Sequence, residues 1–516
     1  MSRPDPDQPD PDQTDPDQPD SDQPDSDQPD SGGVVVCVDF GSTFTKAALV
    51  DLAQGRMVAS AEHRTTIDTD VLEGYAACRE ALTAADPRAR DAEVLACSSA
   101  GGGLRIAVVG NEALVTAEAG RRVALSSGGR VVAVVPMAGR VPDDALDRVL
   151  GDTTPDVVLL TGGTDGGNRR VLLDAAQALV RTGWSGPVVV AGNSDAQADV
   201  SALLGEVPHV LADNVVPRIG VLAPDSARAA IREMFLAHVI GGKHLSAGDA
   251  FVRMVHGATP DLVLTGVELL ARGLPGGAHP GAGDVVVVDV GGATTDVHSV
   301  VEPDPDTALT EDGLAREVVA TTPVTRTVEG DLGMRWSAPS TVAAMAAGAD
   351  APAREEPGTE TRLREAATRR QGDPGFLPDT EEEQALDEQI AAGAAGTALR
   401  RHAGRSRVVV GPEGRVVEQT GTDLREVRLL VGSGGVLRHG GAGVAERVLG
   451  GLVGPDPEGG WQLPRSARVV VDQDYVLAAA GLLLARHPEA AYRLVRRLLD
   501  GRADASDPRM VDGSPG

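Results

Sequence analysis

The stretch VVVCVDFGSTFTKAALVDL, residues 34–52, decides the fold class of this 516-residue chain. It opens with an apolar run typical of a buried strand, but the run leads to Asp39 and then into Gly41, Ser42 and Thr43. Glycine lets backbone N–H groups approach a ligand closely, and small hydroxyl side chains add donors, so such a turn is able to cradle phosphate oxygens. Asp39 would repel phosphate, but it is able to hold a hydrated Mg²⁺. A plain tight hairpin with an exposed Asp fits the same residues.

A second stretch, VVVVDVGGATTDVHSV at 285–300, repeats the same order of parts. An all-valine strand runs into Asp289, which is followed by Gly291, Gly292 and Thr294. A single turn of this kind is compatible with a plain hairpin as well as a phosphate site. Two turns with the same order of strand, Asp and glycines predict a duplicated architecture. We therefore expect two hairpins that face each other across one phosphate chain.

A third glycine-rich turn, EVRLLVGSGGVLRHGG at 426–441, follows another apolar strand. Gly432, Gly434 and Gly435 would offer a flat surface to the base and ribose of a nucleotide, although close packing of backbone explains the same glycines. The other common phosphate motifs do not fit. The nearest approach to a P-loop, AHVIGGKH at 237–244, lacks the first glycine and the final Ser or Thr, and no cluster matches the dinucleotide pattern GxGxxG.

Composition excludes several classes of function. The net charge is −29, which disfavours binding to nucleic acid or to anionic membranes. Aromatic residues make up only 2% of the chain, so platforms for stacking bases are scarce. The three cysteines include no CxxC pair, which fits a reducing compartment, and no apolar run is long enough to span a bilayer. We expect a cytoplasmic protein with no nucleic-acid or membrane partner.

The order of secondary structure predicts an α/β fold, because short apolar strands alternate with helical segments. The clearest expected strands are 34–38, 105–109, 130–135, 156–160, 187–191, 284–290, 406–410, 427–431 and 467–471. The expected helices include 171–182, 225–239, 260–271, 444–450 and 474–485.

The chain divides into lobes and low-complexity segments. Residues 1–31, an acidic repeat of Pro, Asp and Gln, are expected to be disordered, as is a short C-terminus. The stretch 348–388 is charged and poor in apolar residues, which predicts a mobile, surface-exposed insertion. The expected boundaries are 32–282 for lobe I, with an inserted α/β subdomain at about 150–260, 283–500 for lobe II, and 501–516 for a flexible end.

With its three turns in this order, the sequence resembles the actin, Hsp70 and sugar-kinase superfamily of two-lobed ATPases with ribonuclease H-like lobes. More narrowly, it resembles the MutL/GlmL family, the accessory proteins of adenosylcobalamin-dependent glutamate mutase and related aminomutases. The narrower resemblance is carried by stretches along most of the chain, among them DVLEGYAACREAL at 70–82, LLTGGTDGGNRRVLLDAA at 159–176, ADNVVPRIGVL at 212–222 and RTVEGDLGMRWSA at 326–338.

The resemblance implies a set of site residues for ATP and Mg²⁺. Asp39 and Asp289 fall at the Mg²⁺ and catalytic positions, and Lys46 falls where actin-like proteins contact phosphate. The nucleotide-binding positions are Gly41, Ser42, Thr43, Gly291, Gly292, Thr294, Gly432, Gly434 and Gly435. Ala293 stands where Hsp70-like proteins often have a third glycine.

The resemblance also implies a function and partners. An ATPase of this family would bind the subunits of an adenosylcobalamin-dependent mutase and use ATP hydrolysis to exchange damaged cobalamin. A homo-oligomer is compatible with the sequence, which does not define the oligomeric state. An alternative is a small-molecule kinase of the same superfamily, for which Asp165 or Asp195 would serve as the catalytic carboxylate. A filament-forming relative of actin is a third hypothesis, which the large negative charge disfavours.

Overall fold

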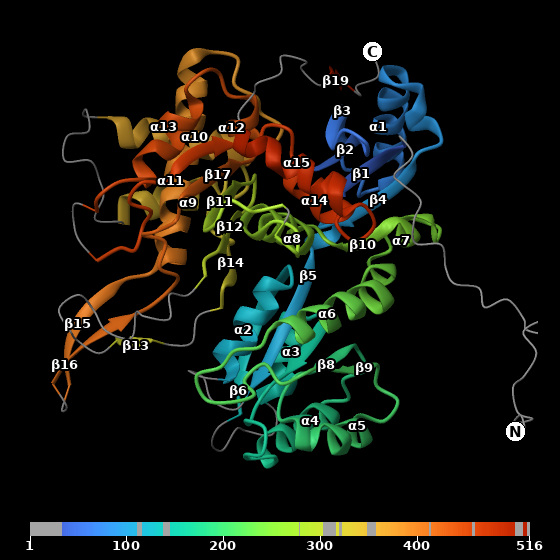
Figure 1. Ribbon diagram of the computed structural model, residues 1–516, viewed down its shortest axis with the longest axis vertical. Coiled ribbons are helices and arrows are strands. Elements are labelled where there is room, and N and C mark those ends of the chain that lie inside the picture. Colours follow the sequence, from blue (N-terminus) through green and yellow to red (C-terminus); the bar gives the residue numbers. More distant parts are fainter. Residues whose placement is uncertain are drawn as a thin grey trace, which may run out of the picture.

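Two β-sheets with the same strand order dominate the structure (Figure 1). The computed structural model describes residues 33–110, 116–137, 145–277, 279–302, 316–318, 322–347, 358–411, 414–456, 460–500 and 509–512. The acidic N-terminal repeat, predicted to be disordered, and most of the C-terminal segment, predicted to be flexible, lie outside these residues.

The sheet of lobe I has the order β10-β4-β1-β2-β3-β19. Strands β1, β2 and β3 form an antiparallel meander, and β4 and β10 continue the sheet in parallel with β1. Helix α1 (Val71–Ala85) crosses from β3 to β4. The strands are β1 (Val34–Phe40), β2 (Phe44–Asp51), β3 (Arg56–Arg64), β4 (Glu93–Ser98), β10 (Val255–Ala258) and β19 (Arg509–Asp512).

The sheet of lobe II has the order β14-β12-β11-β17-β18, which corresponds strand for strand to β3-β2-β1-β4-β10 of lobe I. Again three antiparallel strands are followed by two parallel ones. The strands are β11 (Val285–Val290), β12 (Thr295–Val300), β14 (Val324–Glu329), β17 (Leu429–Ser433) and β18 (Arg468–Val471). This duplication is the ribonuclease H-like pair of lobes that the sequence predicts, and it confirms the two-lobed actin-like fold class.

A third sheet, β6-β5-β7-β8-β9, is inserted between β4 and β10 of lobe I and lies below both lobes in Figure 1. All its strands are parallel. The central strands β5, β7 and β8 are buried, whereas the edge strands β6 and β9 are partly exposed. The sheet begins with β5, which lies upstream of the predicted boundary near residue 150 because β5 pairs with β7. Its elements are β5 (Leu104–Gly110), α2 (Thr116–Ser126), β6 (Gly129–Pro136), α3 (Ala145–Thr153), β7 (Val157–Leu160), α4 (Arg170–Arg181), β8 (Val188–Val190), α5 (Gln197–Leu204), β9 (His209–Leu211), α6 (Asp225–Met234) and, leading back to β10, α7 (Ala250–Met254).

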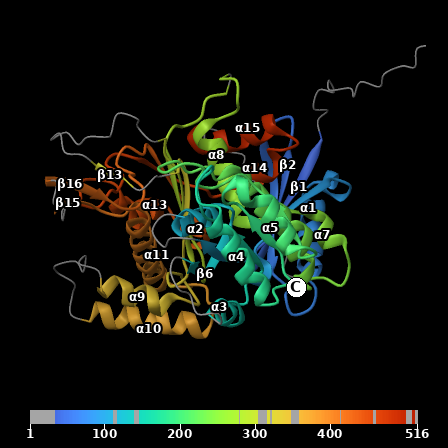
Figure 2. The same ribbon diagram turned by 90° about the horizontal axis from the view of Figure 1, so that it is seen from below.

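Helices α8 (Thr259–Arg272) and α14 (Val476–Leu483) pack against each other between the two lobes (Figures 1 and 2). Each follows the last parallel strand of its own lobe, so the pair repeats the duplication. An ideal Cβ on Gly266 would lie 2.1 Å from the carbonyl oxygen of Leu477, and one on Gly481 would lie 1.9 Å from that of Leu262. Glycine at both positions therefore allows the two helix backbones to touch. Helix α15 (Pro488–Asp500) completes this layer.

The described part of the 348–388 stretch is helical and partly buried, where the sequence predicted a surface-exposed insertion. Helix α10 (Thr359–Gly372) places Leu363, Ala366 and Ala367 in the core of lobe II. Arg370 is fully buried and donates from Nε to Asp387 Oδ1 at 2.5 Å. Few apolar residues suffice here because the charged ones are paired internally. The remaining elements of lobe II are α9 (Ala338–Ala347), α11 (Glu381–Ala403), α12 (Gly435–His439), α13 (Val444–Leu449) and a small sheet of β13 (Arg316–Val318), β15 (Ser406–Gly411) and β16 (Gly414–Gln419).

Candidate nucleotide site

Two hairpins with the same closure project from the two lobes. In the β1–β2 hairpin, Gly41 N donates to Phe44 O at 3.1 Å, and in the β11–β12 hairpin Gly291 N donates to Thr294 O at 2.9 Å. An ideal Cβ on Gly41 or Gly291 would approach the same carbonyl oxygen to 2.6 or 2.9 Å, so the closure favours glycine at both places. Ser42, Thr43 and Gly292 form the tips, which are exposed or half-buried.

Asp39 lies at the end of β1 with its carboxylate buried. Thr259 Oγ1, at the start of α8, donates to Asp39 Oδ1 at 2.6 Å, and the Cys97 thiol lies 3.7 Å from the same oxygen. Lys46 is the partner of Asp39 in the β1–β2 register. Burial raises the pKa of Asp39, and the positive charge of Lys46 opposes that rise.

Asp289 occupies the matching position at the end of β11. Burial raises the pKa of Asp289 to about 6, while Lys46 acts to lower it and Asp296 and Asp39 act to raise it. One oxygen of Asp289, Oδ1, is buried without a hydrogen-bond partner. Because Lys46 acts electrostatically on both aspartates, the structure brings Asp39, Lys46 and Asp289 together between the lobes.

This arrangement fits a hydrated Mg²⁺ and phosphate. A buried carboxylate oxygen without a partner is costly unless a ligand satisfies it. Among the described residues, no three His, Cys, Asp or Glu side chains form a metal cluster. Mg²⁺ is commonly bound by one or two carboxylates together with substrate phosphates and water.

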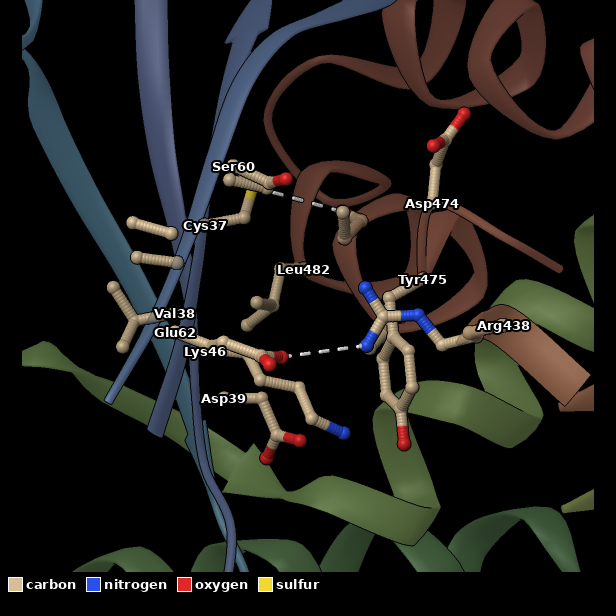
Figure 3. A pocket seen from close by; sticks show the side chains of 15 residues that line it. Cys37, Val38, Asp39, Lys46, Ser60, Glu62, Arg438, Asp474, Tyr475 and Leu482 are labelled. Atoms are coloured by element: carbon tan, nitrogen blue, oxygen red, sulfur yellow. Dashed lines mark hydrogen bonds and ion pairs between the residues drawn. The ribbon is translucent and has the colours of Figure 1, made fainter. Parts of the chain in front are cut away.

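The pocket beside Lys46 is lined in part by Glu62, Arg438 and Tyr475, which the sequence did not single out (Figure 3). Lys46 Nζ lies 3.5 Å from the centroid of the Tyr475 ring, and the Arg438 guanidinium lies 4.7 Å from it. Arg438 also lies 3.8 Å from Glu62 of β3 in an ion pair. Tyr475 therefore joins a cation from each lobe, and the Arg438–Glu62 pair closes the same gap.

Tyr475 has an unusual backbone conformation, with φ of 58° in the left-handed region. It directly precedes α14, whose first amides, those of Val476 and Leu477, donate to the buried carboxylate of Asp472. The sequence carried a signal for this segment: RVVVDQDY at 468–475 is another apolar strand that runs into an Asp, as at both hairpins.

The third glycine-rich turn contains glycines in different settings. An ideal Cβ on Gly432 would meet Leu449 Cδ1 at 2.4 Å, so this glycine serves core packing. Gly434 has φ of 110° and packs against the backbone of Val290, beside the second hairpin. Gly435, at the start of α12, has open space in front of it. Of the three, Gly435 is the one placed to lie against a ligand.

Asp165 and Asp195, the candidate carboxylates of a kinase, lie in the inserted sheet rather than with Asp39 and Asp289. Asp165 Oδ1 accepts from Ser194 N and from Asn214 Nδ2, both at 2.9 Å. Burial acts to raise the pKa of Asp165, but its hydrogen bonds with Ser194 and Asn214 together lower it. Asp195 Oδ2 accepts from Gly166 N at 3.0 Å. Both carboxylates thus hold together the loops that follow β7, β8 and β9.

The duplicated sheets and paired hairpins define a protein with the two-lobed actin-like ATPase fold. Solved structures with weak overall similarity include gluconate kinase from Lactobacillus acidophilus, at 13% identity, TM-score 0.30 and coverage of 92% of this chain and 91% of the other. Another is the activator of 2-hydroxyisocaproyl-CoA dehydratase from Clostridium difficile, at 10% identity, TM-score 0.25 and coverage of 89% and 95%. Similarity this low carries no inference about activity.

Sequence similarity is far stronger within one family. The family model described as MutL protein matches residues 35–499. Protein MutL of Clostridium tetanomorphum is 33% identical over 469 residues, which covers 90% of this chain and 98% of that protein. The chain belongs to the MutL family. Among the described residues, no helix is both long and apolar enough to cross a membrane.

Proposed function

We propose that this protein binds and hydrolyses ATP between its two lobes. The observation that supports the proposal best is the convergence of Asp39, Lys46 and Asp289 from duplicated hairpins. Phosphoryl transfer to water requires mainly positioning and charge neutralisation. Two backbone hairpins, one ammonium group and two carboxylates are sufficient for both.

Each residue has a distinct part in this proposal. Gly41 and Gly291 close the two hairpins, the backbone amides at the hairpin tips beyond them bind phosphate oxygens, and Lys46 neutralises the phosphate charge. Asp39 and Asp289 would hold Mg²⁺, which supplies further neutralisation when bound, and they orient the attacking water. Gly435 lies against the nucleoside. Lys46 must leave the face of the Tyr475 ring, at least in part, to reach phosphate.

The work done by hydrolysis is proposed to be the reactivation of an adenosylcobalamin-dependent aminomutase. Membership of the MutL family supports an accessory role for glutamate mutase or a related enzyme. Such enzymes lose activity when the adenosyl radical is lost and damaged cobalamin stays bound. A tightly held cofactor leaves slowly by mass action alone. Rotation of the lobes, driven by ATP, would open the mutase and allow exchange.

The first test is ATP hydrolysis by the purified protein without any acceptor. Slow release of inorganic phosphate is expected, with Asp39→Asn and Asp289→Asn strongly impaired. Hydrolysis that requires a sugar or acid acceptor, or that is lost in Asp165→Asn, would favour the kinase alternative instead.

The second test is reactivation. A purified aminomutase inactivated by hydroxocobalamin should regain activity when this protein, ATP, Mg²⁺ and fresh adenosylcobalamin are added together. Recovery that is equally fast without ATP would contradict an ATP-driven exchange.

A further inference from the structure

The turn Leu125–Gly129, which joins α2 to β6 in the inserted sheet, is contacted from both lobes. Within the turn, Ser127 N donates to Val123 O at 3.0 Å and Gly128 N donates to Leu125 O at 3.1 Å. These bonds give the turn a defined shape. Each lobe reaches the turn through a short series of contacts that begins at its own hairpin aspartate.

The contact from lobe II is made by Arg326 of β14, whose side chain is only 4% exposed. Arg326 Nη1 donates to Leu125 O and to Gly129 O, both at 3.1 Å. The rest of the guanidinium holds Asp296: Nε and Nη2 donate to Asp296 Oδ1 at 2.9 and 2.5 Å. The planar guanidinium of Arg326 thus joins the turn to the Asp296 carboxylate in a fixed geometry.

Asp296 is the direct neighbour of Asp289 across the second hairpin. The two residues are partners in the β11–β12 register. Any shift of β11 against β12 at the phosphate site therefore moves Asp296, and with it Arg326.

The contact from lobe I is made by the first turn of α8. Thr259 donates to Asp39, and two residues later Asp261 lies against Gly128. An ideal Cβ on Gly128 would lie 2.7 Å from Asp261 N, and Gly128 has φ of 80°, so a side chain is excluded here. Asp261 is itself held by Arg232 of α6, whose Nε donates to Asp261 Oδ2 at 2.5 Å.

From these contacts we propose that the Leu125–Gly129 turn transmits the nucleotide state of the cleft to the inserted sheet, with Arg326 as the positioning residue on the lobe II side. This inference rests on the proposed ATPase function. Because the turn touches both lobes, a change in their relative position has to alter at least one of its two contacts. Close packing makes such a change a switch between two arrangements rather than a gradual deformation.

Hydrogen exchange measured on the full-length protein tests the proposal. Exchange at the Ser127 and Gly128 amides should differ between the nucleotide-free protein and the protein with Mg²⁺ and a non-hydrolysable ATP analogue, by about 5- to 150-fold. In Arg326→Gln this difference should vanish, while the analogue still changes exchange at the two hairpins. Arg326→Lys should behave in the same way, because an ammonium keeps the charge but does not span both partners.

Two further variants guard against misfolding and unspecific effects. The double variant Arg326→Gln, Asp296→Asn removes both charges, so it leaves no unpaired charge, and it should also lose the response of the turn. Arg447→Gln breaks another two-pronged arginine–carboxylate pair of lobe II, in which the half-exposed Arg447 donates from Nη2 to Glu388 Oε1 on α11 at 2.8 Å. This variant should keep the full response of the turn.

The outcomes separate this inference from the proposed function. If the analogue changes exchange at the hairpins of the unaltered protein but not at the turn, the inference is wrong and the ATPase proposal stands. A normal response of the turn in the Arg326 variants would also overturn it. No response anywhere to the analogue would overturn both proposals.

Discussion

In the proposed mechanism, the carboxyl of Asp289 has to be charged to hold Mg²⁺, and this charge works against the folded state. Burial raises the pKa of Asp289 to about 6. The folded protein therefore binds a proton at this group between about pH 4 and pH 6 that the unfolded chain releases. Stability from this group is fully present below about pH 4 and is lost as the pH rises through 6.

Asp289→Asn tests this cost. Relative to the unaltered protein, the variant should gain about 2 kcal/mol of stability between pH 4.5 and pH 7.5, because the amide carries no charge to desolvate. Denaturant unfolding of both proteins at the two pH values measures the difference. A gap that stays constant across this range would show that the carboxyl titrates normally.

The Tyr475 ring is expected to stabilise the contact between the lobes in the absence of nucleotide. It lies against Lys46 and Arg438, and each cation–π contact contributes about 0.5 to 2 kcal/mol. Tyr475→Leu should lower the free energy of unfolding by about 1 to 3 kcal/mol. Tyr475→Phe keeps the ring and serves as the control; equal losses in both variants would assign the effect to the hydroxyl instead.

At the scale of elements, the hairpins were predictable and the strands around them only in part. Apolar runs that end in Asp gave the ends of β1 and β11, because a buried charge followed by glycines is rare without a ligand. The predicted strands did not include β2, β3, β12 or β14, in which polar residues face the cleft or the inserted sheet. Arg326 on β14 is an example: the carbonyl groups that it contacts, those of Leu125 and Gly129, lie far away in the chain, so no local pattern identifies it.

The close contact between helices α8 and α14 leads to a prediction about a single substitution. Gly266→Ala would place a methyl carbon 2.1 Å from Leu477 O, far inside van der Waals contact, so the two helices would have to separate. Separating the helices should cost about 1 to 3 kcal/mol and slow ATP hydrolysis by shifting the lobes. Thermal unfolding and phosphate release measure the two effects.

Gly151→Ala in α3 is the matched control for this substitution. It is also a helical glycine, but an ideal Cβ there meets nothing within 4 Å. Alanine should be neutral or stabilise the protein by about 0.5 to 1 kcal/mol. A similar loss of stability in both variants would contradict a role for the close helix contact.

At the scale of the whole molecule, duplication explains why two distant sequence motifs meet. Because the two sheets share one strand order, each hairpin lies at the corresponding end of its central strands. A core common to both lobes, which includes Val35, Leu264, Val287 and Leu477, brings these two ends together. Two motifs of the same order predicted this pairing. The start of the inserted sheet and the burial of the helical part of 348–388 were predicted less accurately. The first depends on long-range strand pairing, and the second depends on internal ion pairs.

The most direct test of one shared site is a double-mutant cycle on ATP hydrolysis. Asp39→Asn and Asp289→Asn should each lower kcat/KM by about 100-fold or more, and the double variant should fall little further, because the two groups act as a unit. Losses that multiply in the double variant, or a single variant that hydrolyses ATP at the unaltered rate, would show that the two hairpins do not bind the same nucleotide.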